Sequence, residues 1–191
     1  SRGLGDVYKR QEYENIGHSH EIFTQNLDRT VTNVVQLLML KAMTISTAES
    51  CTGGLLSELI TSVPGASQVF ELGVCTYSNR IKQALLNVPE GMLAQYGPVS
   101  RQVALAMVRG LKEKSDADLC ISVTGLAGPG GGTPEQPVGT VYVGFAFGST
   151  EWVSGLRLWE LDAINRNSIR RHTALCAFGI AEHILAEVGN Q

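Results

Sequence analysis

The stretch from Thr140 to Gly148 constrains the fold more than any other part of the chain. Successive side chains of a β-strand point to opposite faces of the sheet. One face of this stretch would carry Val141, Val143, Phe145 and Phe147, and the other Tyr142, Gly144 and Ala146. Neither face has a charge, and such a strand is typical of the inside of a sheet that is covered on both sides. The rest of the chain must therefore supply helices for two faces.

Helical and strand-like patterns alternate along most of the sequence. Apolar residues recur at helical spacing from about Leu27 to Met43 and again between Leu55 and Val63. Ser100 suits the N-cap of a later helix, and a long closing helix is expected to begin at Asn167 or Ser168. Shorter helical segments are predicted at 80–86 and after 89, and strands at 44–48, 68–77, 118–124, 140–148 and 151–159. The order predicts one α/β domain with helices on both faces of a mainly parallel sheet of about five strands.

Composition narrows the class of protein. The chain has 191 residues with 43% hydrophobic and 17% charged side chains, which is a globular composition. A formal net charge of −3 argues against a partner with a phosphate backbone and against an anionic membrane surface. Residues 1–20 lack an apolar period and are expected to be a disordered leader that need not be native to the domain, which then covers 21–191. No apolar run approaches the roughly 20 residues that span a bilayer.

The four cysteines indicate a reducing compartment. Cys51, Cys75, Cys120 and Cys176 are widely separated, without the C-x-x-C spacing of a zinc site or the density of a disulfide scaffold. We therefore expect a cytoplasmic protein without a metal.

Chemistry is expected first at the stretch Thr47–Gly54, where a strand gives way to a helix. Ser50 is placed as a nucleophile beside backbone amides that a helix start leaves unpaired, and Gly53 and Gly54 would let a ligand approach the backbone. The commoner role for Ser50 or Thr52 at such a place is to cap the helix. Cys51 is a rival nucleophile, although a small buried packing residue is the more frequent role for such a cysteine.

A nucleophilic serine needs a base, and Lys82 is the candidate. It follows the strand-ending Thr76–Asn79, whereas His172 and His183 both lie on the predicted closing helix. A lysine has an ordinary pKa of about 10.4 and acts as a base only where burial or positive neighbours disfavour its charge. Taken alone, a lysine at such a position is more often a solvated helix residue than a base. The glycine-rich segment 124–134 matches no nucleotide fingerprint and is either a backbone nest for a phosphate or a wide turn.

Several motifs together resemble one family. They are Thr47–Gly54, Thr76–Asn79 with Lys82, Gly97–Ser100, Ser122–Pro129 and Pro137–Val141, in that order. Over roughly Leu27 to Glu187 the chain closely resembles the CinA C-terminal domain family. The resemblance implies a three-layer α/β/α sandwich with a mixed sheet in which one strand is antiparallel, and a homodimer or larger homo-oligomer.

The resemblance also implies an activity. It implies an amidase that converts nicotinamide mononucleotide to nicotinic acid mononucleotide and ammonia in NAD salvage, without a cofactor. By the same resemblance Ser50 matches the nucleophile, and Tyr77, Lys82 and Thr124 complete the catalytic set. Substrate contacts are expected from Glu49, Thr52, Gly53, Gly54, Asn79, Gly125, Gly128 and Arg166.

One stretch departs from the family pattern. Ile164–Asn165–Arg166 stands where the family often has Gly-Asp-Arg, so only the arginine is kept. In the expected mechanism neutral Lys82 takes the Ser50 proton, amides near Thr52–Gly54 stabilise the oxyanion, and protonated Lys82 or Tyr77 supplies the proton for departing ammonia. Two alternatives stay open. They are a catalytically silent nucleotide-binding partner module and an amidase for another small carboxamide.

Overall fold

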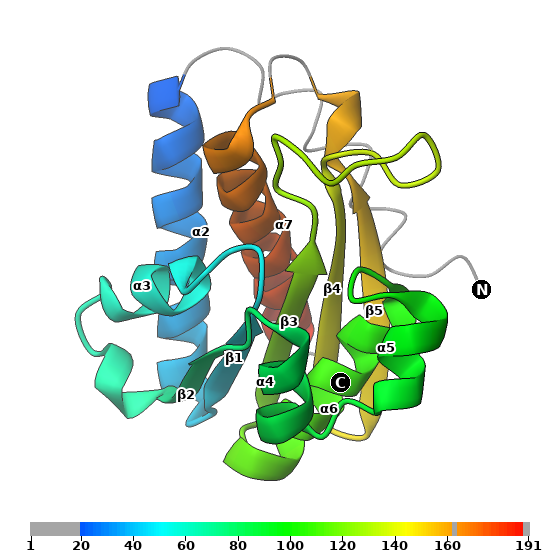
Figure 1. Ribbon diagram of the computed structural model, residues 1–191. Helices are drawn as coiled ribbons and strands as arrows, with labels where there is room; N and C mark the ends of the chain where they lie inside the picture. Colours follow the sequence, from blue (N-terminus) through cyan, green and yellow to red (C-terminus); the bar gives the residue numbers. More distant parts are fainter. Residues whose placement is uncertain (1–19, 162–163, 189–191) are drawn as a thin grey trace.

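One sheet of five strands runs through the computed structural model, which describes residues 20–161 and 164–188 (Figure 1). The strands are β1 (Ile45–Glu49), β2 (Phe70–Cys75), β3 (Leu119–Gly125), β4 (Thr140–Phe147) and β5 (Thr150–Arg157). Their order in the sheet is β2-β1-β3-β4-β5. β1 pairs in parallel with β2 and β3, whereas β4 is antiparallel to both β3 and β5. Four strands therefore point one way and β4 the other, which confirms the predicted mainly parallel mixed sheet.

Helices cover both faces of the sheet. One face carries α2 (His20–Lys41), α3 (Leu55–Thr61) and α7 (Arg166–Glu187), and the other carries α4 (Asn79–Leu86), α5 (Glu90–Tyr96) and α6 (Arg101–Ser115). Two short 3-10 helices, η2 (Ala66–Gln68) and η3 (Leu158–Glu160), complete the elements of the described ranges. Figure 1 shows α2 and α7 side by side on one side of the sheet and α4, α5 and α6 on the other. The predicted three-layer sandwich is confirmed.

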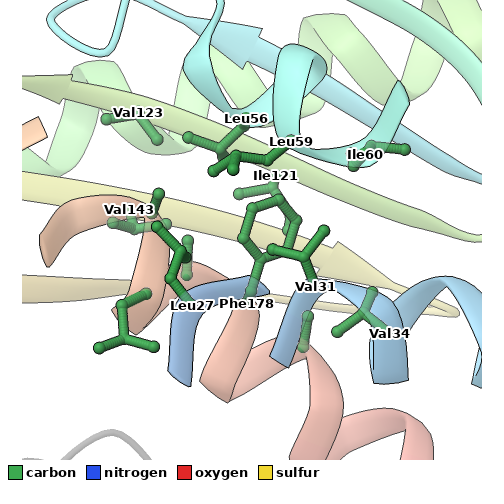
Figure 2. Packing of buried hydrophobic residues seen from close by; sticks show 14 of the residues in the cluster. Leu27, Val31, Val34, Leu56, Leu59, Ile60, Ile121, Val123, Val143 and Phe178 are labelled. Atoms are coloured by element: carbon green, nitrogen blue, oxygen red, sulfur yellow. The ribbon is translucent and has the colours of Figure 1, made fainter. Parts of the chain in front are cut away.

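Each face has its own apolar core. Figure 2 shows the larger one, in which side chains of α2, α3 and α7 meet those of β3 and β4; its labelled members include Leu27, Val31, Leu56, Ile121, Val143 and Phe178. The smaller core packs α6 on the opposite face, through Val103, Met107 and Leu111. Phe145 of β4 belongs to the first core and Ala146 to the second. The strand that was predicted to be covered on both sides is covered in this way, one position in from the edge of the sheet.

The first helix is longer than its sequence pattern indicates. It begins at His20, whereas the apolar period becomes clear only near Leu27. The added turns are held by tertiary packing, because Phe23 is buried and its ring lies 4.4 Å from the His172 ring of α7, centroid to centroid. Of the predicted leader, residues 1–19 lie outside the described residues. None of the helices in the described ranges is both long and apolar enough to cross a membrane.

The contact between α4 and α6 generates a stability prediction. A Cβ added at Gly110 of α6 would lie 2.0 Å from the carbonyl oxygen of Leu86 at the end of α4. Gly110→Ala should therefore lower the free energy of unfolding by about 1–3 kcal/mol through overpacking, despite the better helix propensity of alanine. Gly91→Ala in α5 is the matched control, because nothing lies within 4 Å of its added Cβ. It should raise stability by up to about 1 kcal/mol. Urea unfolding of both variants tests the contact, and equal effects would contradict it.

Candidate active site

The predicted motifs converge at one edge of the sheet, where β1, β2 and β3 end. The Ser50 amide, directly after β1, donates to the carbonyl of Val123 in β3 at 3.0 Å. The Thr76 amide, directly after β2, donates to the carbonyl of Glu49 at 2.8 Å. These bonds extend the parallel ladders by one residue and place the Ser50 loop between the other two strand ends.

Lys82 reaches Ser50 from the first turns of α4. That helix begins after the N-cap Ser78, whose hydroxyl accepts from the Ile81 amide. The Lys82 side chain is only 1% exposed, and its Nζ lies 3.0 Å from Ser50 Oγ. Nζ also donates to the carbonyls of Thr76 at 2.7 Å and Tyr77 at 3.3 Å. Lys82 is therefore not a solvated helix residue, and the two residues that sequence reasoning paired are in contact.

The surroundings of Lys82 favour its neutral form. Burial lowers the pKa of Lys82 below its ordinary value of 10.5. Within the described ranges, no carboxylate forms an ion pair with it. A neutral amine has two N–H groups and one lone pair, and two of its three neighbours are carbonyls that can only accept. In the ammonium form Nζ donates to Ser50 Oγ as well as to the two carbonyls. In the neutral form, with the N–H groups donated to Thr76 and Tyr77, the lone pair is left for the hydroxyl of Ser50.

Glu49 organises the loop that carries Ser50. Its side chain is fully buried, and its carboxylate accepts from the amides of Gly54, Leu56 and Ser57 and from the Ser57 hydroxyl, at 2.9–3.0 Å. The three amides are free backbone donors at the start of α3, where a carboxylate is stabilised by hydrogen bonds and by the helix dipole. Glu49 was expected to contact substrate, but both of its carboxylate oxygens accept hydrogen bonds from the protein itself.

The helix-capping alternative for Ser50 and Thr52 is wrong. The N-cap of α3 is Gly54, in the left-handed conformation with φ of 95°, and no side chain caps the helix from that position. Thr52 Oγ1 is buried without a hydrogen-bond partner among the described residues. Glu49 does the capping instead, which leaves the hydroxyl of Ser50 to Lys82.

The loop amides differ from expectation. Of the amides expected to face an oxyanion, that of Gly53 donates to the Ser50 carbonyl at 3.0 Å and that of Gly54 to the Glu49 carboxylate. Both are therefore committed within the loop. The amides of Cys51 and Thr52 make no backbone hydrogen bond to the described residues. Of the three expected amides, only that of Thr52 therefore stays without a backbone hydrogen bond to the described residues, and the Cys51 amide joins it.

Cys51 is a packing residue in this structure. Burial raises the pKa of its thiol to about 12, an effect only partly offset by its own backbone amide and reinforced by Glu49. At neutral pH the sulfur is therefore a thiol and not a thiolate, and a thiol is a poor nucleophile.

Thr124 and Gly125 close the β3 side of the site. Thr124 is 1% exposed, and its hydroxyl donates to the carbonyl of Pro98, just before α6, at 2.7 Å. Its proton is thereby committed, and its oxygen can still accept. A Cβ at Gly125 would lie 2.7 Å from Cγ2 of Val141, so glycine is required there for close packing of β3 and β4.

Arg166 joins Tyr77 to the glycine-rich loop. Its guanidinium donates to the Tyr77 hydroxyl at 2.9 Å and to the Gly128 carbonyl at 2.6 Å. Tyr77 is 61% exposed, and it meets Lys82 through its carbonyl rather than its hydroxyl. The phenol therefore belongs to the far side of the site. Asn79, the first residue of α4, is also exposed.

Arg170 is a residue that sequence reasoning missed. It lies one helical turn after Arg166 and donates from Nε at 3.1 Å and Nη2 at 2.8 Å to the carbonyl of Thr52. Spacing of four on the predicted closing helix was the available signal, because residues i and i+4 share a helix face. A carbonyl partner on a distant loop leaves no trace in the sequence pattern.

The departure from Gly-Asp-Arg preserves the helix start. Asn165 is the N-cap of α7, and its side chain accepts from the amides of Asn167 and Ser168 while the Ser168 hydroxyl accepts from the Asn165 amide. Asparagine and aspartate are about equally good N-caps. Ile164 packs against the larger core. Arg166 is consequently the first residue of a capped helix, although the Gly and Asp of the family pattern are replaced by Ile164 and Asn165.

The fold and site define an α/β/α domain with a buried serine–lysine pair at the carboxyl edge of its sheet. Comparison with known proteins agrees: residues 27–185 match the model of the CinA C-terminal domain. The chain belongs to the CinA C-terminal domain family.

Relatives and solved structures support this membership. A CinA-like protein of Akkermansia muciniphila is 52% identical over 126 residues, which cover 66% of this chain and 30% of that protein. One from Thermotoga neapolitana is 48% identical over 122 residues, 64% of this chain and 30% of the relative. The crystal structure of competence/damage inducible protein CihA from Agrobacterium tumefaciens superposes with a TM-score of 0.79 at 34% identity, covering 84% of this chain and 96% of that one. The chain spans about a third of the length of the curated relatives it matches.

Burial of Lys82 predicts a pH-dependent stability. Below the lowered folded-state pKa, a buried protonated amine destabilises the fold; that cost shrinks as pH rises toward 10.5, because the unfolded chain then binds more protons than the folded one. Lys82→Met removes the cost at every pH. The stability of the variant relative to wild type should therefore be greatest at low pH and decline as pH rises, in urea unfolding from about pH 6 to about pH 10. Lys114→Met, at an exposed lysine, is the control. A difference for Lys82→Met that stays constant over this range would contradict a lowered pKa.

The cap of α7 yields a second prediction. Asn165→Asp should leave stability within about 0.5 kcal/mol of wild type, since both side chains cap well. Asn165→Ala should cost about 1 kcal/mol, because two amides lose their acceptor. Thermal unfolding of the two variants checks the contrast, and an equal loss in both would show that the side-chain cap is not what matters.

Proposed function

We propose that this domain is an amidohydrolase that deamidates nicotinamide mononucleotide to nicotinic acid mononucleotide and ammonia, with Ser50 as nucleophile and Lys82 as base. The observation that carries the proposal is the 3.0 Å contact between Ser50 Oγ and a buried Lys82 Nζ that has no carboxylate partner within the described ranges. Serine–lysine pairs are a known variant of the catalytic triad. The choice of substrate is supported by the family resemblance and by the arginines around the site.

The first half of the reaction forms an acyl-enzyme. Ser50 Oγ attacks the carboxamide carbon as its proton passes to the lone pair of Lys82, whose N–H groups stay bonded to the carbonyls of Thr76 and Tyr77. The carboxamide oxygen becomes an oxyanion, for which the amides of Cys51 and Thr52 are the available donors. The tetrahedral intermediate then collapses with loss of the nitrogen.

Lys82 also serves the departing group. Its ammonium returns the proton to the leaving nitrogen, so that neutral ammonia departs and Lys82 is again a base. Tyr77 is less suited to this step, because its hydroxyl faces Arg166 and not Lys82. Water then attacks the acyl carbon and gives a proton to Lys82. As the bond from the acyl carbon to Ser50 Oγ breaks, Lys82 returns that proton to Oγ, which frees the carboxylic acid and restores the Ser50 hydroxyl and the neutral amine.

Arg166 and the glycine-rich loop supply the far side of the pocket. The Arg166 guanidinium is exposed at the start of α7 and contacts both the loop and Tyr77. An arginine fork matches phosphate oxygens. A mononucleotide has a carboxamide at one end and a phosphate at the other, which corresponds to the serine and the arginine of this site.

Loss of the nucleophile tests the proposal. Ser50→Ala should reduce ammonia release from nicotinamide mononucleotide by at least about 10³-fold, because no acyl-enzyme can form. Ser62→Ala, at an exposed serine whose hydroxyl donates to the Leu59 carbonyl, is the matched control and should keep full activity. Undiminished turnover by Ser50→Ala would eliminate the nucleophile.

The same assay separates the alternatives. Thermal stabilisation of the wild type by nicotinamide mononucleotide without ammonia release would favour a nucleotide-binding partner module. Ammonia release from other pyridine or small carboxamides, but not from the nucleotide, would favour a different amidase.

A further inference from the structure

Arg170 contacts the loop after Ser50 at the Thr52 carbonyl and not at the serine itself. Three donors converge on the Thr52 carbonyl: Nε and Nη2 of Arg170, and the Leu55 amide at 3.3 Å. The third guanidinium nitrogen, Nη1, lies 3.4 Å from Asn167 Oδ1. The bidentate hydrogen bond from Arg170 to one loop carbonyl is not required to start α3, because the Glu49 carboxylate already caps that helix.

Two peptide groups connect this cation to the residue after the nucleophile. The Thr52 carbonyl shares its peptide group with the Gly53 amide, and the Gly53 amide donates to the Ser50 carbonyl at 3.0 Å. The Ser50 carbonyl in turn shares its peptide group with the Cys51 amide. A charge at the first carbonyl therefore polarises both peptide groups in the same sense, since hydrogen bonds in a chain strengthen one another in a protein interior.

We infer that Arg170 is a positioning residue that strengthens the Cys51 amide as the oxyanion donor for attack by Ser50. The amide directly after a serine nucleophile is a frequent oxyanion donor, and the Cys51 amide makes no backbone hydrogen bond to the described residues. Its nearby acceptor is its own sulfur, which is a weak one. Arg170 therefore acts on the reaction through the backbone, and this role rests on the proposed function.

A purely structural role for Arg170 predicts something different. If the guanidinium only held α7 to the loop, its loss would lower stability and leave the chemical step of the surviving fold unchanged. A role in oxyanion stabilisation concerns charge that exists only in the transition state, so kcat falls while KM stays the same. The two roles therefore separate in the kinetics and in the electronic state of one amide.

The kinetic test uses Arg170→Gln and Arg170→Lys in the whole chain. For Arg170→Gln, kcat for ammonia release should fall roughly 10-fold, less than the 10²–10³-fold cost of removing an oxyanion donor outright. KM should stay within about two-fold of wild type. Arg170→Lys should lie between, because lysine keeps the charge and loses the two-pronged geometry. Arg171→Gln is the matched control: it removes the neighbouring arginine of α7, which bonds Thr24 of α2, and should leave kcat unchanged.

The second test needs no turnover. In amide NMR spectra of the free protein, the Cys51 proton should move upfield in Arg170→Gln, as expected for a less polarised donor, and stay in place in Arg171→Gln. An unchanged kcat in Arg170→Gln, or a Cys51 shift no larger than in Arg171→Gln, would overturn the inference. If wild type releases no ammonia, the proposed function fails. The amide shift still decides whether Arg170 polarises the Cys51 amide through the two peptide groups.

Discussion

Two buried ionisable side chains, Glu49 and Lys82, flank Ser50, and the site depends on their not forming an ion pair. Glu49 precedes the serine and faces α3, whereas Lys82 reaches it from α4 on the other face of the sheet. An ion pair between them would favour the ammonium form of Lys82 and remove its lone pair. Because the sheet separates them, each group is stabilised by different neighbours. The carboxylate takes four hydrogen bonds from α3, and the amine is stabilised in its neutral form.

The hydrogen bonds of Glu49 and Lys82 restrict the conformation of the loop from Ser50 to Gly54. Because Glu49 binds the Gly54 amide and the Gly53 amide turns back to the Ser50 carbonyl, the chain from Ser50 to Gly54 has few ways to move. Among the residues that the structure describes, Lys82 is the hydrogen-bond partner of the serine hydroxyl. A nucleophile held by backbone hydrogen bonds can meet its base without a large entropic cost of ordering. Rigidity of the loop and the lowered pKa of Lys82 therefore have the same origin, namely burial at the strand ends.

Much of this arrangement could be predicted from the sequence, and the failures have a common cause. Strand and helix types followed from apolar periods, and Ser100 was identified as the N-cap of α6 from its position before an amphipathic run. The Ser50–Lys82 pair was predicted from chemistry and family resemblance together. What could not be predicted is which backbone carbonyl accepts the hydrogen bond of a given side chain. Thr124 bonds to Pro98 and Arg170 to Thr52, pairs far apart in the chain whose partners are backbone carbonyls, which every residue possesses.

The closing helix is consequently part of the site as well as a cover for one face of the sheet. Its first turns bind both loops: Arg166 donates to Gly128 on one side, and Arg170 to Thr52 on the other. A helix that only buried apolar area would need no charge at this end, and arginines close to a helix N-terminus are disfavoured by the dipole. The hydrogen bonds from Arg166 to Gly128 and Tyr77 and from Arg170 to Thr52 offset that electrostatic cost. The capped start at Asn165 fixes where α7 begins, and the start of α7 in turn places Arg166 against Gly128 and Arg170 against Thr52.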